Sequence, residues 1–247
     1  MRKSDHIKTQ EAKSKNRRGI QMKLLSTKDS HVNGVKILVY GVSGAGKTRL
    51  CATTNGPTVI LSAEAGLLSL REHDIPVIPI QGIDDLYQAY DYLANDPDGQ
   101  IFAWICLDSI SEIGEVVLSA SKKSTKDPRA AYGDLQEKMG DLLRAFRDLP
   151  GRNVYFSAKQ ERVKDEATGI MLYGPSMPGA KLPQMLPYFF DEVAVLRAER
   201  TETGDLVRTL QTFSDLQFTA KDRSGALAPY EEPSLENIAT KISGGAN

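Results

Sequence analysis

The sequence predicts an α/β domain with a mostly parallel central sheet flanked by helices and with antiparallel strands toward the C-terminal end. Short apolar runs rich in β-branched residues alternate with amphipathic stretches of helical spacing, as in repeated strand–helix units. One run is apolar without interruption, which is typical of a parallel strand buried on both faces. At 247 residues, 40% of them hydrophobic and 26% charged, the chain suits one such domain with a modest extension.

The first predicted strand, residues 35–40, leads directly into a glycine-rich motif of the form G-x-x-x-x-G-K-T. Its residues are Gly41, Val42, Ser43, Gly44, Ala45, Gly46, Lys47 and Thr48. The glycines let successive backbone N–H groups turn toward phosphate oxygens, and the positive end of the following helix dipole favours the same anion. In such a P-loop the lysine reaches the β- and γ-phosphates and the threonine hydroxyl holds Mg²⁺. A turn that fits by chance would not need the strand and every fixed position, so we expect a nucleoside triphosphate site.

Strands and helices alternate after the motif. In order, we expect a helix to about residue 54, a strand at 58–61, a short helix at 67–72, a strand at 77–80, a helix at 83–94, an apolar strand at 101–108 and a helix at 110–120. The apolar strand ends in Asp108, 61 residues after Lys47. A carboxylate at this edge of the sheet lies beside the P-loop and can hold Mg²⁺. The common alternative is an aspartate that caps the next helix.

The second half of the chain has two segments without a clear period. One is a polar, basic break at 121–129, and the other is the stretch 160–181, rich in Gly, Pro and charge. Between and after them we expect a helix at 130–148, a strand at 153–159, a helix at 182–190, strands at 192–198 and 207–213, a late strand at 218–225 and a short helix from residue 234. Irregular segments as long as 160–181 are usually functional in compact domains.

Charge and cysteine content add little about function. Residues 1–23 hold eight Lys or Arg and two acidic residues, a net charge of +6. Since the whole chain has a net charge of −1, the remaining residues carry about −7. A basic arm is compatible with nucleic-acid contact and equally with a disordered, solvated tail, and Met22 is an alternative start. Cys51 and Cys106 are expected to be buried thiols in a reducing compartment. With no secretory signal and no run long enough to span a bilayer, we expect a cytoplasmic protein without membrane contact.

Other P-loop classes lack their motifs here. The guanine-binding N-K-x-D and the transporter L-S-G-G-Q signature are absent, and the segment 160–181 holds only one arginine where small-molecule kinases have an Arg-rich lid. The chain instead resembles the RecA-like ATPases over residues 35–226. That resemblance rests on Ala63-Glu64 after the second strand, on Asp108-Ser109, and on the K-x-R element in residues 221–225, KDRSG. Through this element and residues 127–139, the chain is similar to phage-encoded Sak-type single-strand annealing and recombination ATPases.

The resemblance implies roles for particular residues. Glu64 is the expected general base, Thr48 and Asp108 hold Mg²⁺, and Lys221 or Arg223 reaches the ATP of a neighbouring subunit. The sensor position falls on Lys159 or Gln160, and Tyr132 or Tyr173 stacks on bases of single-stranded DNA. DNA loops are expected at 121–132 and 160–181, with the binding residues Lys122, Lys123, Lys126, Arg129, Arg162 and Lys164.

The resemblance also implies cofactors, partners and domains. We expect ATP and Mg²⁺, slow hydrolysis stimulated by DNA or oligomerisation, and a filament or ring in the cytoplasm of a bacterial host. A phage single-strand binding protein or nuclease is a further expected partner. The predicted parts are a basic tail at 1–23, a RecA-like ATPase domain at 24–230 and a helical tail at 231–247. RecA's large C-terminal domain is lacking, which puts strand exchange in doubt more than annealing.

Each role has a structural alternative that the residues leave open. Glu64 also fits as a cap of the following helix, Lys221 and Arg223 as surface charges, the basic residues as a solvated loop, and the tyrosines as packing residues. A second hypothesis for the whole protein is an ATP-dependent regulatory or loader ATPase that assembles on a protein partner without touching DNA.

Overall fold

The computed structural model describes residue 26 and the ranges 33–64 and 67–244. The account below concerns the unit of residues 31–247. The predicted basic tail at 1–23, Met22 and most of the segment before the P-loop strand lie outside the described residues. None of the helices in the described ranges is long and apolar enough to cross a membrane.

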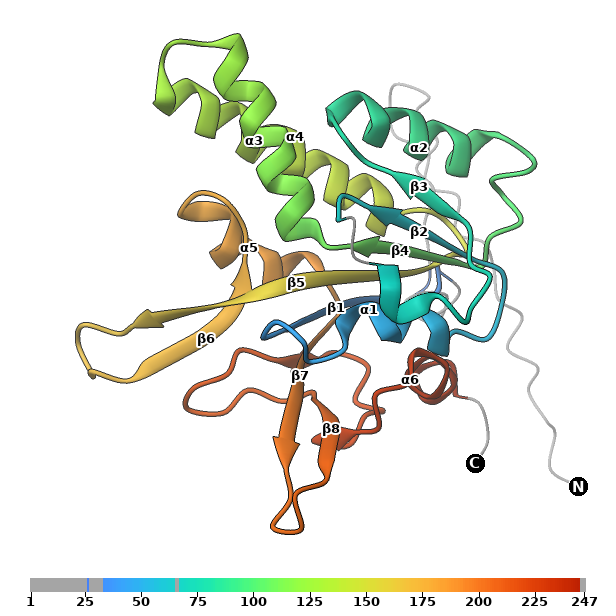
Figure 1. Cartoon of the computed structure of the whole chain (residues 1–247), viewed down its shortest axis with the longest axis vertical. Coiled ribbons are helices and arrows are strands. Elements are labelled where there is room, and N and C mark those ends of the chain that lie inside the picture. Colours follow the sequence, from blue (N-terminus) through green and yellow to red (C-terminus); the bar gives the residue numbers. More distant parts are fainter. Residues whose placement is uncertain (1–25, 27–32, 65–66, 245–247) are drawn as a thin grey trace, which may run out of the picture. The chain divides into compact units, whose positions relative to one another are not determined.

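A ten-stranded sheet forms the centre of the described domain (Figure 1). Its strands are β1 Lys36–Gly41, β2 Thr58–Ser62, β3 Val77–Pro79, β4 Trp104–Asp108, β5 Asn153–Lys164, β6 Met171–Ser176, β7 Glu192–Arg200, β8 Leu206–Gln211, β9 Lys221–Asp222 and β10 Tyr230–Glu231. The order is β10-β8-β7-β1-β5-β4-β2-β3, with β6 paired to β5 and β9 to β7. The six strands from β7 to β3 are parallel, and the others pair antiparallel. The predicted fold class, an α/β domain with a P-loop, a mostly parallel central sheet flanked by helices and later antiparallel strands, is confirmed.

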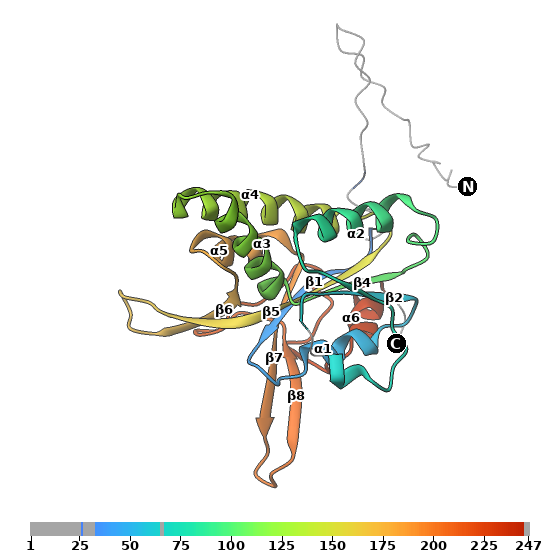
Figure 2. The same ribbon diagram turned by 45° about the horizontal axis from the view of Figure 1, so that its top comes forward.

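Helices cover both faces of this sheet (Figure 2). They are α1 Lys47–Leu50, α2 Ile83–Asn95, α3 Ile110–Ser124, α4 Pro128–Arg147, α5 Lys181–Phe189 and α6 Leu235–Ile242, with 3-10 turns η2 Cys51–Thr53 and η3 Leu67–Leu70. Alternate residues of β1 serve the two faces, because side chains of a strand point in opposite directions in turn. Leu38 and Tyr40 pack with α2 to α5, whereas Ile37 and Val39 pack with α1 and α6. Burial on both sides explains the uninterrupted apolar strands.

The segment 160–181 differs from its prediction as an irregular stretch. It forms most of a β-hairpin, because Lys159–Lys164 of β5 pair antiparallel with Met171–Ser176 of β6. The side chain of Asp165 closes the turn by accepting hydrogen bonds from the N–H groups of Ala167 and Thr168. Gly174 and Pro175 lie within β6, so the glycine and proline content that favoured a loop belongs to an outer strand, where proline is tolerated.

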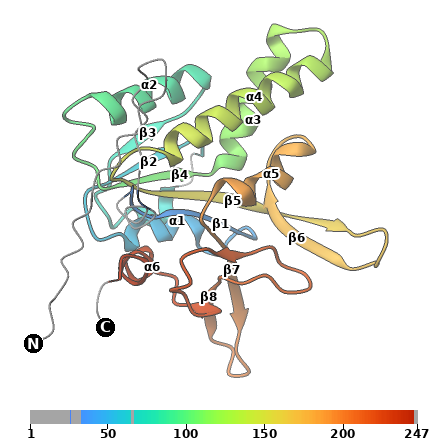
Figure 3. The same cartoon turned by 180° about the vertical axis from the view of Figure 1, so that it is seen from behind.

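The basic break at 121–129 is also more regular than predicted. Helix α3 continues to Ser124, and its buried Ser121 donates a hydrogen bond of 2.5 Å to Asp134 of α4. Helix α4 begins at Pro128, where Asp127 caps it by accepting from the Arg129 N–H at 2.9 Å. The predicted first DNA loop is therefore mainly helical. The α3–α4 turn and the β5–β6 hairpin project on the same side of the domain, with α5 between them (Figure 3).

Two other elements are shorter than predicted. The helix behind the P-loop has one α-helical turn, α1, and continues as the 3-10 turn η2. The late strand at 218–225 is reduced to the two residues of β9. Asp222 accepts hydrogen bonds from the N–H groups of Gly225 and Leu227, so the backbone turns away from the sheet at that point.

Candidate functional site

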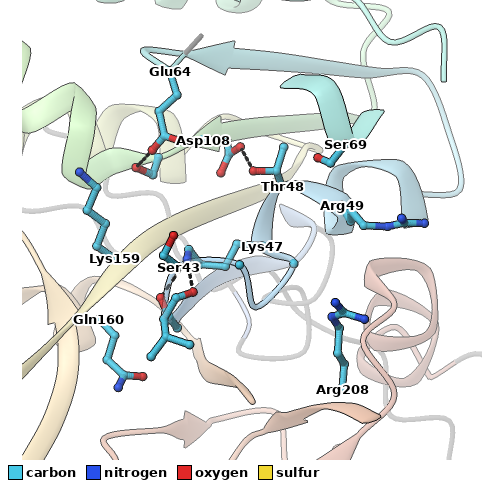
Figure 4. A pocket seen from close by; sticks show the side chains of 15 residues that line it. Ser43, Lys47, Thr48, Arg49, Glu64, Ser69, Asp108, Lys159, Gln160 and Arg208 are labelled. Atoms are coloured by element: carbon cyan, nitrogen blue, oxygen red, sulfur yellow. Dashed lines mark hydrogen bonds between the residues drawn. The ribbon is translucent and has the colours of Figure 1, made fainter. Parts of the chain in front are cut away.

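A cavity of about 490 Å³ lies where the parallel strands end (Figure 4). The P-loop after β1 forms its floor. Glu64 follows β2, Asp108 ends β4, and Lys159 and Gln160 belong to β5. Since neighbouring parallel strands present their carboxyl ends at one edge of a sheet, these residues converge although they are distant in sequence. The structure thus brings together the predicted P-loop, general-base, metal and sensor positions.

The P-loop backbone adopts conformations that need glycine at two positions. Gly44 and Gly46 have φ of 79° and 109°, in the left-handed region that disfavours side chains. The ammonium of Lys47 donates hydrogen bonds to the carbonyl oxygens of Gly41 and Val42 at 2.8 and 3.0 Å. The lysine side chain is therefore folded back over the P-loop. A bound phosphate would replace these two carbonyl oxygens as its hydrogen-bond acceptor.

Electrostatics at Lys47 favour an anionic ligand. Burial lowers the pKa of Lys47, and the nearby carboxylates of Asp108 and Glu64 oppose this change. A phosphate beside the partly desolvated ammonium would stabilise its charged form further, because an opposite charge at short range favours that form and counteracts desolvation.

Thr48 and Asp108 form a pair of oxygen ligands. Thr48 Oγ1 donates to Asp108 Oδ2 at 2.7 Å, and Ser157 Oγ donates to the other carboxylate oxygen, Oδ1. Asp108 is only 3% exposed, so these hydroxyls orient a buried carboxylate. The donor set fits Mg²⁺, which binds one or two carboxylates and completes its shell with phosphates and water. Among the described residues no group of three or more His, Cys, Asp or Glu could hold a metal by itself.

Glu64 points across the sheet edge rather than along its own strand. Its Oε1 accepts a hydrogen bond of 2.9 Å from Ser109 Oγ, and the same hydroxyl accepts from the Glu112 N–H at the start of α3. Lys159 donates to the carboxylate of Glu112, and this hydrogen bond raises the pKa of Lys159. Glu64 is therefore linked through the start of α3 to one of the two predicted sensor residues. Gln160 also lines the cavity, so both sensor candidates remain.

The predicted trans-acting residues do not line this cavity. Lys221 Nζ donates to the Pro187 carbonyl at 2.5 Å, and Arg223 forms an ion pair of 3.1 Å with Asp191. Burial lowers the pKa of Lys221, with the Arg223 charge adding to the effect. The predicted DNA-binding residues are also outside the cavity. Lys122 and Lys123 are on α3, Lys126 lies between helices, Arg129 is on α4, and Arg162 and Lys164 are on β5.

Ser157, Arg49 and Arg208 are among the residues at the site that were not predicted. Ser157 supports Asp108, and its polar side chain inside an otherwise apolar strand was the available signal. Arg49 directly follows the P-loop motif and lines the cavity. Arg208 of β8 also lines it and donates from Nε to the Ala45 carbonyl at 2.8 Å, across 163 residues of sequence. No local motif marks Arg208, because only the pairing of β7 with β8 brings it there.

The chain matches the model of one known protein family. The model of the AAA domain family matches residues 33–224, which is most of the chain. No curated protein matches. Among solved structures, a KaiC-like protein from the hyperthermophilic archaeon Pyrococcus horikoshii OT3 is similar at 15% identity and a TM-score of 0.41, over 72% of this chain and 77% of that chain. The family match, on a chain whose cavity is built around a P-loop, shows that the protein belongs to the AAA domain family of P-loop ATPases.

Proposed function

We propose that this protein binds and hydrolyses ATP at subunit interfaces and uses ATP to hold single-stranded DNA for annealing or recombination, as Sak-type ATPases do. Its family supports the nucleotide-binding part. The DNA part rests mainly on one observation, a basic groove on the side of the domain where the α3–α4 turn projects. The groove has a volume of about 450 Å³ and lies between the start of α4 and the segment that joins β6 to α5.

The lining of this groove suits a nucleic-acid strand. Arg129 and Lys181 lie in it with the ring of Tyr132, and no acidic residue is among the described residues that line it. The Lys122 ammonium lies 5.3 Å from the centre of the Tyr132 ring, which adds a third positive charge. Positive side chains around an exposed aromatic ring are the combination by which proteins grip single strands without reading sequence. Tyr173, the other aromatic candidate, instead stacks on Phe218 at 4.8 Å between ring centres.

Hydrogen bonds connect the groove with the nucleotide cavity. Ser111 Oγ accepts from the Lys159 N–H at 2.8 Å and donates to the Ser176 carbonyl at 2.6 Å. Lys159 lines the cavity, and Ser176 lies two residues before Pro178, which lines the groove. A shift of the β5 backbone at Lys159 on nucleotide binding would therefore be passed through Ser111 to the strand that leads into the groove. This link supports DNA binding that depends on ATP.

The proposed hydrolysis uses the residues already placed at the cavity. Water attacks the γ-phosphorus, Glu64 accepts its proton, and the bond to the oxygen bridging the β- and γ-phosphorus breaks. Lys47 binds the phosphates, and Thr48 and Asp108 would hold Mg²⁺, which would supply charge neutralisation. Lys221 or Arg223 of a neighbouring copy adds positive charge, a contribution that reaches about 10³-fold for arginines acting in trans. A filament or ring, and a phage single-strand binding protein or nuclease as partner, belong to the same proposal.

A second candidate function, an ATPase that acts on a protein partner without DNA, is favoured by another surface. A groove of about 380 Å³ between the β5–β6 hairpin and α5 is lined by Val163, Leu172 and Tyr188. All three are exposed, Tyr188 to 77%. Apolar side chains gathered at one exposed groove are typical of a protein-binding surface.

Binding of labelled single-stranded DNA across a salt series, with and without ATP and Mg²⁺, tests the proposal. We expect binding that needs ATP, weakens steeply with salt and is lost in Lys47→Ala. The double variant R129Q/K181Q should lower the slope of log affinity against log salt by about 1.4, because each phosphate contact on a single strand contributes about 0.7. Arg200→Gln, on the β7–β8 hairpin, is the matched control. Absence of binding at low salt with ATP hydrolysis intact would leave the partner-driven ATPase.

A further inference from the structure

A second cavity adjoins the nucleotide cavity and has no role so far. It measures about 210 Å³ and shares Gly46, Arg49 and Arg208 with the first cavity. Figure 4 shows Arg49 and Arg208 on the same side of the P-loop, whereas Lys159 and Gln160 lie on the other. The two cavities thus meet beside Gly46, at the end of the site away from the sensor residues.

The placement of the triphosphate indicates what enters this second cavity. Glu64, Asp108 and Lys159 gather at one end of the nucleotide cavity, so that end receives the γ-phosphate and the attacking water. The α-phosphate and the nucleoside must then leave the P-loop toward Arg49 and Arg208. The second cavity continues the nucleotide cavity in that direction.

Arg208 is fixed where the two cavities meet. Its Nε is used in the hydrogen bond to the Ala45 carbonyl, and within the described ranges the two terminal nitrogens of the guanidinium have no hydrogen-bond partner and can donate to a ligand. A side chain at Gly46 would place its Cβ 3.2 Å from Arg208 Nε, so the glycine is also what lets the arginine approach the loop. Arginine held in this way can donate to an α-phosphate or to ribose oxygens.

The walls of the second cavity have the chemistry of a base-binding site. Leu50 and Leu196 are 2% exposed and offer apolar surface, and Ala52 of η2 lines the cavity with a small side chain. Arg49 provides a planar guanidinium on which an aromatic ring can stack. None of the described residues that line the cavity is a carboxylate, so the N–H groups that distinguish guanine would meet no charged acceptor, and the ring nitrogens of either purine can accept hydrogen bonds from the arginines.

We propose that this cavity is the nucleobase subsite, that it takes a purine by stacking, and that Arg208 holds the nucleotide where base and phosphates meet. The inference rests on the nucleotide-binding part of the proposed function. The proposal predicts that the affinity for ATP in excess of that for its triphosphate part comes mostly from burial of the base ring. Discrimination between ATP and GTP should therefore be small.

Calorimetric titration with ATP, GTP and inorganic tripolyphosphate, all with Mg²⁺, tests the subsite. The wild-type chain should bind ATP about tenfold or more tighter than tripolyphosphate, because stacking of one base contributes a factor of this order. GTP should bind within about fivefold of ATP, since a carboxylate reader is lacking. Equal affinity of the wild-type chain for ATP and tripolyphosphate would overturn the proposal without any variant.

Two variants separate the subsite from the P-loop. Ala52→Phe fills the cavity and should remove the advantage of ATP over tripolyphosphate while the tripolyphosphate affinity stays within about twofold. Arg208→Gln should weaken ATP about tenfold, and Arg200→Gln should change neither ligand. Unchanged ATP affinity in Ala52→Phe would refute the assignment. No DNA enters these titrations, so their outcome does not depend on single-strand binding, and tripolyphosphate alone reports on the P-loop.

Discussion

Glu192, at the start of β7, gives the most quantitative prediction about stability. Its side chain is buried, its Oε1 accepts from the Ser224 N–H at 3.3 Å, and its Oε2 has no hydrogen-bond partner in the described structure. Burial raises the pKa of Glu192 to about 8, and the neighbouring Asp222 carboxylate adds to this effect. Burial also acts on Asp222, but hydrogen bonds from Ser224 and Leu227 outweigh it and keep the pKa of Asp222 below its usual value. Glu192 therefore carries the proton at neutral pH.

The substitution Glu192→Gln removes this titration and preserves the size of the side chain. The ordinary pKa is 4.5, so between pH 4.5 and 8 the folded chain holds one more proton than the unfolded chain. Because the folded-state pKa is raised, this stabilisation is complete below pH 4.5 and is lost as the pH rises to 8. The wild type loses this stabilisation as the pH rises and the variant does not. The unfolding free energy of the variant minus that of the wild type should therefore increase by about 1.4 kcal/mol per pH unit from pH 5 to 8.

Urea unfolding at pH 5, 6, 7 and 8 measures this difference. The chain has one tryptophan, Trp104, which is fully buried in β4 and reports unfolding by fluorescence. Glu199→Gln is the control, since Glu199 is on the same strand with its side chain 63% exposed. The control should differ from the wild type by the same amount at every pH. A pH-independent difference for Glu192→Gln would refute the argument that burial keeps this carboxyl protonated.

Three further predictions concern other parts of the domain. Glu64→Gln should slow ATP hydrolysis by about 10²-fold or more and leave the ATP dissociation constant within about twofold, with exposed Glu72→Gln as control; unchanged turnover would exclude Glu64 as the base. Lys36 is buried and donates to the carbonyls of Leu149 and Arg152, and burial lowers its pKa to about 8. Its folded-state pKa is thus depressed below 10.5, so wild-type stability should rise by up to about 1.4 kcal/mol per pH unit between pH 8 and 10 relative to Lys36→Met, and parallel urea curves would argue against this. Gly34→Ala should lose more stability than Gly151→Ala by about 1 kcal/mol or more. Both glycines have positive φ, but only at Gly34 would the new Cβ meet a carbonyl, that of Arg152 at 2.3 Å, so equal losses would contradict the clash.

Much of the fold could be predicted because its signals are local. The apolar strands, the helical spacing at 83–94 and the P-loop each occupy a few consecutive residues, and the structure has elements at these places. The predictions that were wrong concern segments whose structure depends on distant partners. The β5–β6 hairpin forms through pairing between strands, and α3 extends to Ser124 because Ser121 packs against α4. Neither contact produces a periodic hydrophobic pattern in the sequence.

The candidate site divides in the same way. The sequence and the family resemblance predicted one site from the P-loop, Glu64 and Asp108, and the structure has all of them around one cavity. Whether Lys221 and Arg223 act on a neighbouring subunit stays a prediction. Only the tertiary structure placed Arg208 against Ala45 and opened the groove beside Tyr132 and Lys181. The physical reason is that sheet order and helix packing bring together side chains that are far apart in the sequence, whereas a short motif determines only the local conformation of its own residues.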